Sequence, residues 1–178
     1  NGEEKFQINR FICAHAIMFA MEGIPAIYIH SFLGTKNDYK AIAAGEGNRS
    51  INRFKWDKKD IHKILEDKNS NNFYIMSKLN SLLNIRSKQP AFHPNATQFT
   101  LNLGDEVFGL WRQDKKRKQS IFSIYNVTLK SVKLSLQKIN LIETEKWIDL
   151  ISGEALNDID DDILLKPYQS LWISNYSP

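Results

Sequence analysis

The stretch Gly23–Arg53, GIPAIYIHSFLGTKNDYKAIAAGEGNRSINR, says most about the fold of this chain. It begins with a short apolar run, Ile24–Ile29, bounded by a glycine and by a polar loop, a pattern typical of a strand buried on both faces of a parallel sheet. Pro25 is tolerated because it occupies one of the first positions of that strand. The loop that follows is long and rich in Gly and Asn, and such loops commonly carry function. The stretch therefore predicts a strand that delivers a functional loop to one edge of a sheet.

Helical patterns flank this stretch on both sides. The segment from Glu3 to Glu22 has acidic residues at its start, few breakers and a natural stop at Gly23, so it predicts a helix. Its second part, FICAHAIMFAM, is apolar on almost every side, which indicates contact with protein on more than one face. Asp57 is a good cap for a further helix, and another helix is expected from about Ser70. The latter carries an apolar stripe at helical spacing, formed by Ile75, Met76, Leu79, Leu82 and Leu83.

The second half of the chain has a different pattern. Near Lys88 the segment KQPAFHPNATQ ends the helical region with two prolines and an Asn, and we place a domain boundary there, between residues 1–87 and residues 88–178. Short alternating runs separated by turn-rich segments then predict an antiparallel sheet or sandwich of about seven strands. The runs are Phe99, Leu101 and Leu103; Val107 to Trp111; Ile121 to Val127; Val132, Leu134 and Leu136; Trp147 to Leu150; Ile163 to Leu165; and Leu171 to Ile173.

Composition excludes several classes of function. With 178 residues, 42% of them hydrophobic and 25% charged, and a net charge of +4, the chain has the composition of a soluble globular protein. The basic run Lys115–Lys118 is expected to be a solvated hairpin tip, because no aromatic platform or basic helix accompanies it, so we expect no nucleic-acid partner. No stretch reaches the roughly 20 apolar residues of a membrane span, and we expect no membrane partner. The single cysteine, Cys13, is expected to be buried, which fits a reducing, cytoplasmic compartment.

The predicted strand has no neighbour in this sequence. A parallel strand needs parallel partners, yet the chain holds no second apolar run of the same kind. The start, NGEEKFQ, has no initiator Met and lacks the features of a signal peptide. We therefore expect the chain to be part of a longer protein, with self-association possible through the incomplete sheet.

Several motifs together resemble one enzyme family. GIPAIYIHSFLGTKND followed by NRSINR is similar to the eighth-strand region of the α-amylase superfamily, glycoside hydrolase family 13, in the branch that contains sucrose phosphorylase and related glucosyl phosphorylases. Relatives in that branch carry a Gly-(Ile/Val)-Pro-x-(Ile/Val)-Tyr strand, a Leu-x-x-Lys-Asn-Asp loop and an Ile-Asn-Arg stretch. The segments FGLWR, SIYNVT and PYQSLWI resemble the β-domain that follows the barrel in these enzymes. The resemblance covers essentially the whole chain.

This resemblance implies a fold of class α/β plus all-β: a C-terminal fragment of a (β/α)8 TIM barrel, with its last helices and eighth strand, followed by an antiparallel β-domain. Active sites in that fold lie at the carboxyl ends of the strands. The family's retaining chemistry uses a carboxylate nucleophile, a carboxylic acid/base and a third carboxylate that stabilises the transition state. All three belong to earlier strands, and nothing in this chain matches their motifs. We therefore expect the parent enzyme to use a sugar and inorganic phosphate, and this chain alone to be inactive.

Four residues are candidates for sugar binding. Arg53 matches a family arginine that reaches the glucose of the first subsite, and Asp38 matches the family's Lys-Asn-Asp stretch. Either residue has a structural alternative: Arg53 could bind backbone carbonyls, and Asp38 could cap a turn. His30 ends the predicted strand on the pocket side, and Arg49 lies in the same loop. His15 is interpreted as a core histidine.

We expect no cofactor and no metal site. No Cys/His set has zinc spacing, and the cluster Asp158, Asp160, Asp161 and Asp162 lacks the Gly and the terminal Glu of an EF-hand loop.

Two other functions remain open. The parent enzyme is alternatively an α-glucosidase or amylase-type hydrolase, in which water takes the glucosyl group. The second half is alternatively a non-catalytic carbohydrate-binding or interaction module, with Trp111, Trp147 and Trp172 as stacking candidates. Packing inside the β-domain is the stronger account of these rings, because they alternate with apolar neighbours.

Overall fold

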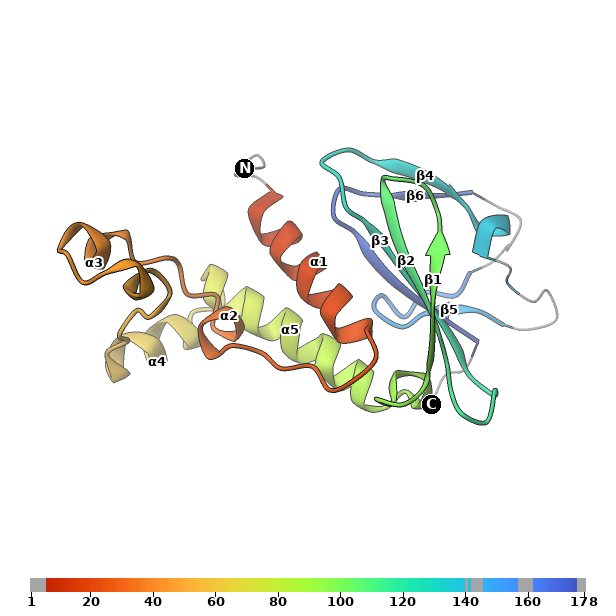
Figure 1. Cartoon of the computed structure of the whole chain (residues 1–178), viewed down its shortest axis with the longest axis horizontal. Helices are drawn as coiled ribbons and strands as arrows, with labels where there is room; N and C mark the ends of the chain where they lie inside the picture. Colours follow the sequence, from red (N-terminus) through yellow and green to blue (C-terminus); the bar gives the residue numbers. More distant parts are fainter. Residues whose placement is uncertain (1–5, 140, 142–145, 157–161, 176–178) are drawn as a thin grey trace. The chain divides into compact units, whose positions relative to one another are not determined.

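The computed structural model describes residues 6–139, 141, 146–156 and 162–175, which form two compact units. We call Asn1–Pro25 together with Leu82–Pro178 the β unit, and Ala26–Ser81 the loop unit. One helix, α5 (Asn71–Ser87), begins in the loop unit and ends in the β unit (Figure 1). It is the helix predicted from about Ser70, and the Ser70 hydroxyl accepts a hydrogen bond from the Phe73 N–H at its start.

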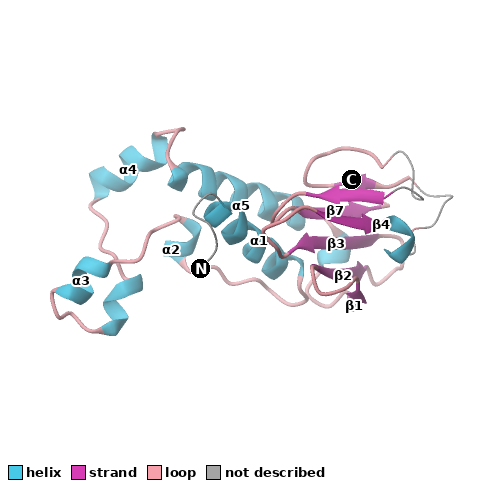
Figure 2. Cartoon of the chain, turned by 90° about the horizontal axis from the view of Figure 1, so that it is seen from above, coloured by secondary structure: helices cyan, strands magenta, loops and turns pink. Residues whose placement is uncertain are grey.

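All seven predicted strands are present in the β unit. Strands are magenta in Figure 2. Every pairing is antiparallel. Five strands form one sheet in the order β1-β2-β3-β7-β5, and β4 and β6 form a separate pair. The bounds are β1 (Thr97–Asn102), β2 (Val107–Gln113), β3 (Ser120–Asn126), β4 (Val132–Ser135), β5 (Ile148–Asp149), β6 (Asp162–Leu165) and β7 (Ser170–Ser174); short 3-10 helices η3 (Pro90–Phe92) and η4 (Leu136–Ile139) complete the unit.

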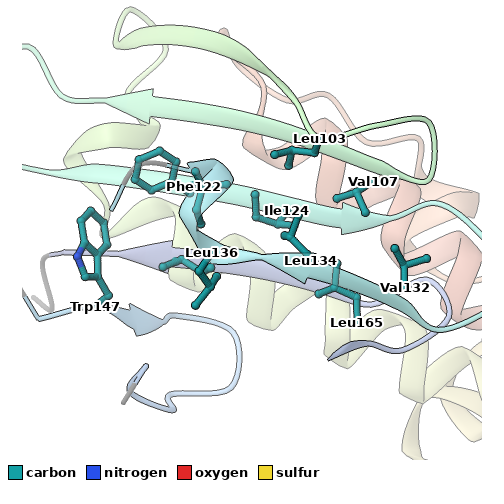
Figure 3. Close-up of a cluster of buried hydrophobic side chains, with 11 residues drawn as sticks. Leu103, Val107, Phe122, Ile124, Val132, Leu134, Leu136, Trp147 and Leu165 are labelled. Atoms are coloured by element: carbon teal, nitrogen blue, oxygen red, sulfur yellow. The ribbon is translucent and has the colours of Figure 1, made fainter. Parts of the chain in front are cut away.

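The core of the β unit lies between its two sheets. Alternate residues of β3, such as Phe122 and Ile124, point toward the β4–β6 pair, which contributes Val132, Leu134 and Leu165 (Figure 3). Trp147 joins the same cluster and packs against Phe122, and the ring of Trp111 stacks on Phe122 with centroids 5.8 Å apart. The expected sheet or sandwich is therefore confirmed, and these two tryptophans serve its packing.

Helix α1 (Gln7–Ala20) covers the other face of the five-stranded sheet (Figure 1). The Tyr125 hydroxyl on β3 donates to the carbonyl of Ala16 and accepts from the indole N–H of Trp172, which is fully buried. Cys13 is buried in α1 as expected, and burial raises the pKa of its thiol. His15 is half-buried, with Nδ1 2.8 Å from the Phe11 carbonyl oxygen. The helix ends at Ala20, two residues before the predicted Glu22.

Two buried arginines hold the end of α1. Arg86 of α5 donates to the carbonyls of Phe19 and Gly23, and Arg112 of β2 donates to that of Ala20 at 2.6 Å. The carbonyls of Phe19 and Ala20 have no helical partner, because the last carbonyls of a helix are left unpaired, and Gly23 lies in the turn that follows. Burial, and then the neighbouring Arg86, lower the pKa of Arg112 to about 10. Gly23 has φ +87°, which suits a turn that follows a helix. Arg112 also donates to Thr97, His93 and Ala96 carbonyls.

The basic run forms an exposed tip of the β2–β3 hairpin, as predicted. The acidic cluster lies outside the described residues except for Asp162, which begins β6 and pairs with Lys133 at 2.7 Å.

The prediction of a strand at Ile24–Ile29 is wrong for this structure. Residues 24–28 carry no regular secondary structure, and Ile29 begins the short helix α2 (Ile29–Phe32). The side chains of Ile24 and Ile29 are 84% and 57% exposed. A parallel strand exists only when neighbouring strands pair with its backbone groups, and the described part of the chain supplies none for this segment. The apolar pattern at residues 24–29 is typical of a buried strand, but the neighbouring parallel strands that it needs are not among the described residues.

The rest of the loop unit consists of short helices joined by loops. These are α3 (Tyr39–Ala43), η2 (Asn48–Asn52), α4 (Lys58–Glu66) and the first part of α5. The predicted cap of α4 is confirmed, since the Asp57 carboxylate accepts a hydrogen bond from the Lys59 N–H at 2.8 Å.

Candidate functional site

A cleft of about 450 Å³ opens in the loop unit, within the polar loop that the sequence singled out. It combines three aromatic rings with hydrogen-bonding side chains, a lining that suits a small polar ligand. The lining residues are Thr35, Lys36, Asn37, Asp38, Tyr39, Lys40, Phe54, Trp56 and Asn72.

The start of the polar loop is fixed to α5 through Asn72, which lines the cleft. Asn72 donates to the carbonyls of Leu33 and Gly34 at 2.7 and 3.1 Å. Gly34 has φ +62°, and a Cβ there would lie 2.8 Å from Cδ1 of Ile75. Both the conformation and the close approach therefore require glycine at this position.

A hydrogen-bonded chain links the two sides of the loop. The indole N–H of Trp56 donates to the Thr35 hydroxyl at 2.9 Å, and the same oxygen lies 3.2 Å from Nδ1 of His30. His30 also lies against the ring of Tyr28, whose hydroxyl donates to the carbonyl of Asn52 at 2.8 Å. His30 belongs to α2 and does not line the cleft, but it supports Thr35, which does.

Asp38 lines the cleft and also caps α3. Its Oδ1 accepts from the Ala41 N–H at 3.0 Å, and its own N–H donates to the carbonyl of Ile51 at 2.7 Å. The structural role that the sequence left open for this residue is therefore present. One carboxylate oxygen accepts the capping hydrogen bond, and the second has no hydrogen-bond partner among the described residues.

Arg49 and Arg53 are exposed and do not line the cleft. Arg49 lies in η2, and Arg53 follows that helix with its N–H bonded to the Ser50 carbonyl. Within the described ranges, neither guanidinium makes a hydrogen bond or an ion pair with the protein. The structure therefore does not show Arg53 tied to backbone carbonyls, and leaves both side chains accessible to a ligand.

The aromatic part of the cleft was not predicted from the sequence. Phe54 and Trp56 meet edge to face with ring centroids 5.0 Å apart, and Tyr39 is 68% exposed beside them. Aromatic rings pack well against the apolar faces of flat or ring-shaped ligands. The Phe-x-Trp spacing directly after the Ile-Asn-Arg stretch is the signal in the sequence that points to these rings.

The described residues hold no group of three or more His, Cys, Asp or Glu side chains placed to bind a metal ion. In the same part of the chain, none of the helices has the length and apolar character needed to cross a membrane.

No protein-family model matches the chain, but several characterised proteins do. It is 34% identical over 96% of its length to a glucosylglycerate phosphorylase of Allomeiothermus silvanus, and 32% identical over 92% to the glucosylglycerate phosphorylase of Escherichia coli. It is 30% identical over 73% to a sucrose 6(F)-phosphate phosphorylase of Thermoanaerobacterium thermosaccharolyticum. The chain spans only 28% of the first two relatives and 24% of the third.

Solved structures share the fold. A crystal structure of AmyP in complex with maltose matches 96% of this chain and 35% of its own length, with a TM-score of 0.74 and 15% identity. A mutant of trehalulose synthase MutB matches 97% of this chain and 39% of its own, with a TM-score of 0.68. The sequence matches and the shared fold show that the chain belongs to the α-amylase superfamily, glycoside hydrolase family 13, as a C-terminal part of an enzyme of its sucrose phosphorylase-like branch.

Proposed function

We propose that this chain is the C-terminal part of a retaining α-glucosyl-transferring phosphorylase, which converts a glucoside and inorganic phosphate to glucose 1-phosphate. The observation that carries the proposal is that the three relatives described above are all phosphorylases. In this proposal residues 1–87 are the last part of the catalytic barrel and residues 88–178 its β-domain. The buried Cys13 suits a cytoplasmic enzyme.

The reaction of such an enzyme proceeds in two displacements. A carboxylate attacks the anomeric carbon, the bond to the leaving oxygen breaks, and the acid/base residue gives that oxygen a proton. An oxygen of phosphate then attacks the anomeric carbon of the glucosyl ester and releases the carboxylate. The nucleophile and the acid/base belong, by the resemblance, to parts of the enzyme outside this chain. This chain therefore supplies a binding surface and performs neither displacement alone.

We assign the binding surface to the polar loop. Arg53 and Arg49 present guanidinium groups that no described residue engages, and such a fork suits vicinal hydroxyls. Asp38 offers its second carboxylate oxygen, and His30 holds Thr35 in place. The rings of the cleft, with Trp56 fixed by its hydrogen bond to Thr35, give a sugar an apolar surface.

The proposal is tested with a chimaera. The purified 178-residue chain should form no glucose 1-phosphate from glucosylglycerate or sucrose with phosphate. A chimaera in which this chain replaces the matching part of the Escherichia coli glucosylglycerate phosphorylase should catalyse phosphorolysis of glucosylglycerate. Turnover by the chain alone would contradict its role as a binding surface, and a folded chimaera that only hydrolyses its substrate would contradict the phosphorylase assignment.

Single substitutions in that chimaera test the residue roles. Arg53→Ala should lower kcat/KM by about a hundredfold, because a charge-assisted hydrogen bond to the sugar is lost. Asp38→Asn keeps an oxygen for the α3 cap and removes only the charge. A loss of activity in this variant would therefore show that Asp38 acts on the ligand and not only as a cap. Lys63→Ala, on the exposed surface of α4, serves as the matched control. Unchanged kinetics for both test variants would leave Arg53 and Asp38 as structural residues.

We also propose that the chain associates with itself through Tyr28 and Ile29 of the loop unit, which expose apolar surface. Light scattering after gel filtration should show a larger species whose proportion rises with concentration, and Ile29→Asp should reduce it. A strictly monomeric chain at all concentrations would exclude this association.

A further inference from the structure

A second hollow, of about 480 Å³, lies in the β unit at the tip of the β2–β3 hairpin. It is separate in sequence from the cleft of the loop unit, and nothing in the proposed reaction uses it. One wall is the hairpin tip and the other is the segment around η3. The lining residues are Pro90, His93, Asp114, Lys115, Lys116, Lys118 and Gln119.

The tip is held in one conformation by Asp114. Its Oδ1 accepts from the N–H groups of Lys118 and Gln119 at 2.6 and 2.7 Å, and its Oδ2 accepts from that of Lys116 at 3.0 Å. Arg117 completes the turn with φ +56°. Partial burial disfavours the charged form, but the three N–H donors outweigh it and hold the pKa of Asp114 below its usual range. The four basic side chains therefore project from an ordered turn.

Gln119 ties the two walls together. This side chain is buried; its oxygen accepts from the Ala91 N–H at 2.9 Å, and its Nε2 donates to Gln89 Oε1 at 2.6 Å and to Ser174 Oγ at 3.1 Å. Both walls of the hollow are thus fixed to one buried amide, so the hollow is formed before any ligand arrives.

The charge of the hollow is strongly positive. Lys115, Lys116 and Lys118 are exposed, and neither ion pair found among the described residues involves them. The only acid in the lining is Asp114, and both of its oxygens already accept backbone N–H groups. On the opposite wall His93 Nδ1 accepts from the Asn95 N–H at 3.1 Å, so in the neutral ring Nε2 carries the proton and is a donor.

We propose that this hollow binds a small phosphate-bearing anion, such as a phosphate monoester. Three ammonium groups and one imidazole N–H match the several acceptor oxygens and the double charge of a phosphate group near neutral pH. A volume of about 480 Å³ has room for one sugar-sized group attached to that phosphate. A nucleic acid is the less suitable ligand, because the lining offers no Phe, Tyr or Trp ring on which bases could stack.

The test uses the whole 178-residue chain with glucose 1-phosphate as the probe. Backbone amide NMR signals should shift on titration at about 0.15 M salt, where weak surface attraction is screened. Within the β unit, saturable shifts should be confined to residues 114–119 and to His93 and Asn95, whereas any shift in the loop unit reports on the proposed sugar cleft. The Lys116→Gln/Lys118→Gln double variant should weaken binding by about tenfold or more, through the loss of two charge-assisted contacts. Glucose at the same concentration should cause no shift of the signals of residues 114–119, His93 and Asn95.

Matched controls make the outcome decisive. Lys58→Gln/Lys59→Gln removes the same charge from α4 and should leave the affinity unchanged. An equal loss in both double variants, or shifts without saturation, would show general charge attraction and overturn the site. Inorganic phosphate serves as a second probe, to distinguish a free phosphate ion from a phosphate monoester as the ligand. If both probes bind with equal affinity, the site recognises phosphate itself; if glucose 1-phosphate binds more tightly, the site recognises the monoester. A single-stranded RNA oligonucleotide that binds at least tenfold tighter than either probe would overturn the small-anion assignment.

Discussion

The β unit and the loop unit differ in whether their elements find partners within this chain. In the β unit each described strand pairs with a neighbour, and both faces of the central sheet are covered. In the loop unit the buried hydrophobic residues of the described part are only Leu33, Ile75 and Leu79. The contrast teaches that an apolar segment folds as its pattern indicates only where the surfaces that cover it are present.

The largest expected difference is in local stability. Backbone amides of β3 should exchange with solvent only through global unfolding, whereas those between Lys36 and Trp56 should exchange through local opening. Hydrogen exchange should show free energies of opening that differ by about 5 kcal/mol between the two regions. Equal protection in both would contradict the division drawn here.

The next largest effect should come from Arg112→Met. The substitution leaves four backbone carbonyls without this donor, so we expect a loss of about 3–5 kcal/mol in the free energy of unfolding of the β unit. Urea denaturation followed by tryptophan fluorescence measures it, because Trp172 is buried in that unit. Arg10→Met, on the exposed side of α1, is the control and should change stability little. A small effect of Arg112→Met would mean that water replaces the guanidinium without cost.

A smaller, pH-dependent effect is expected from Asp114→Asn. The folded state lowers the pKa of this carboxyl, so its contribution is present above the unfolded value of about 4 and is lost as pH falls through the folded value. At pH 7 the variant should be less stable by about 1–2 kcal/mol, and the gap should narrow in acid. Thermal unfolding at pH 7 and pH 3 gives the comparison, with exposed Asp105→Asn as control. A gap independent of pH would exclude the carboxylate charge as its cause.

The smallest effect should come from Asp57→Ala, which removes the cap of α4 and should cost about 1 kcal/mol. Hydrogen exchange of the α4 amides should show it, while amides of β3 should not change. Asp57→Asn keeps a capping oxygen and should behave nearly as the original chain. A change that spread to β3 would show that the two units unfold together.

The same contrast explains what the sequence could predict. The seven strands followed from alternation and turns, because their partners lie in the chain and local pattern agrees with tertiary structure. The strand predicted at Ile24–Ile29 is absent because the described residues supply no neighbouring strand to pair with it. Asp38 was placed correctly in the loop, yet its cap on α3 and the rings of Phe54 and Trp56 around the same cleft depend on how the loop closes. The contacts of Arg86 and Arg112 were not predicted, since no charge pattern indicates a carbonyl partner.

The contacts of Arg86 and Arg112 have a consequence for which substitutions related chains can tolerate. Their acceptors are main-chain oxygens at positions 19, 20, 23, 93, 96 and 97, which any amino acid supplies. Substitutions at the acceptor positions therefore need no compensating change at the arginines. Two chains can share this junction while sharing few residues around it, and a search for pairs of positions that change together would pass over it.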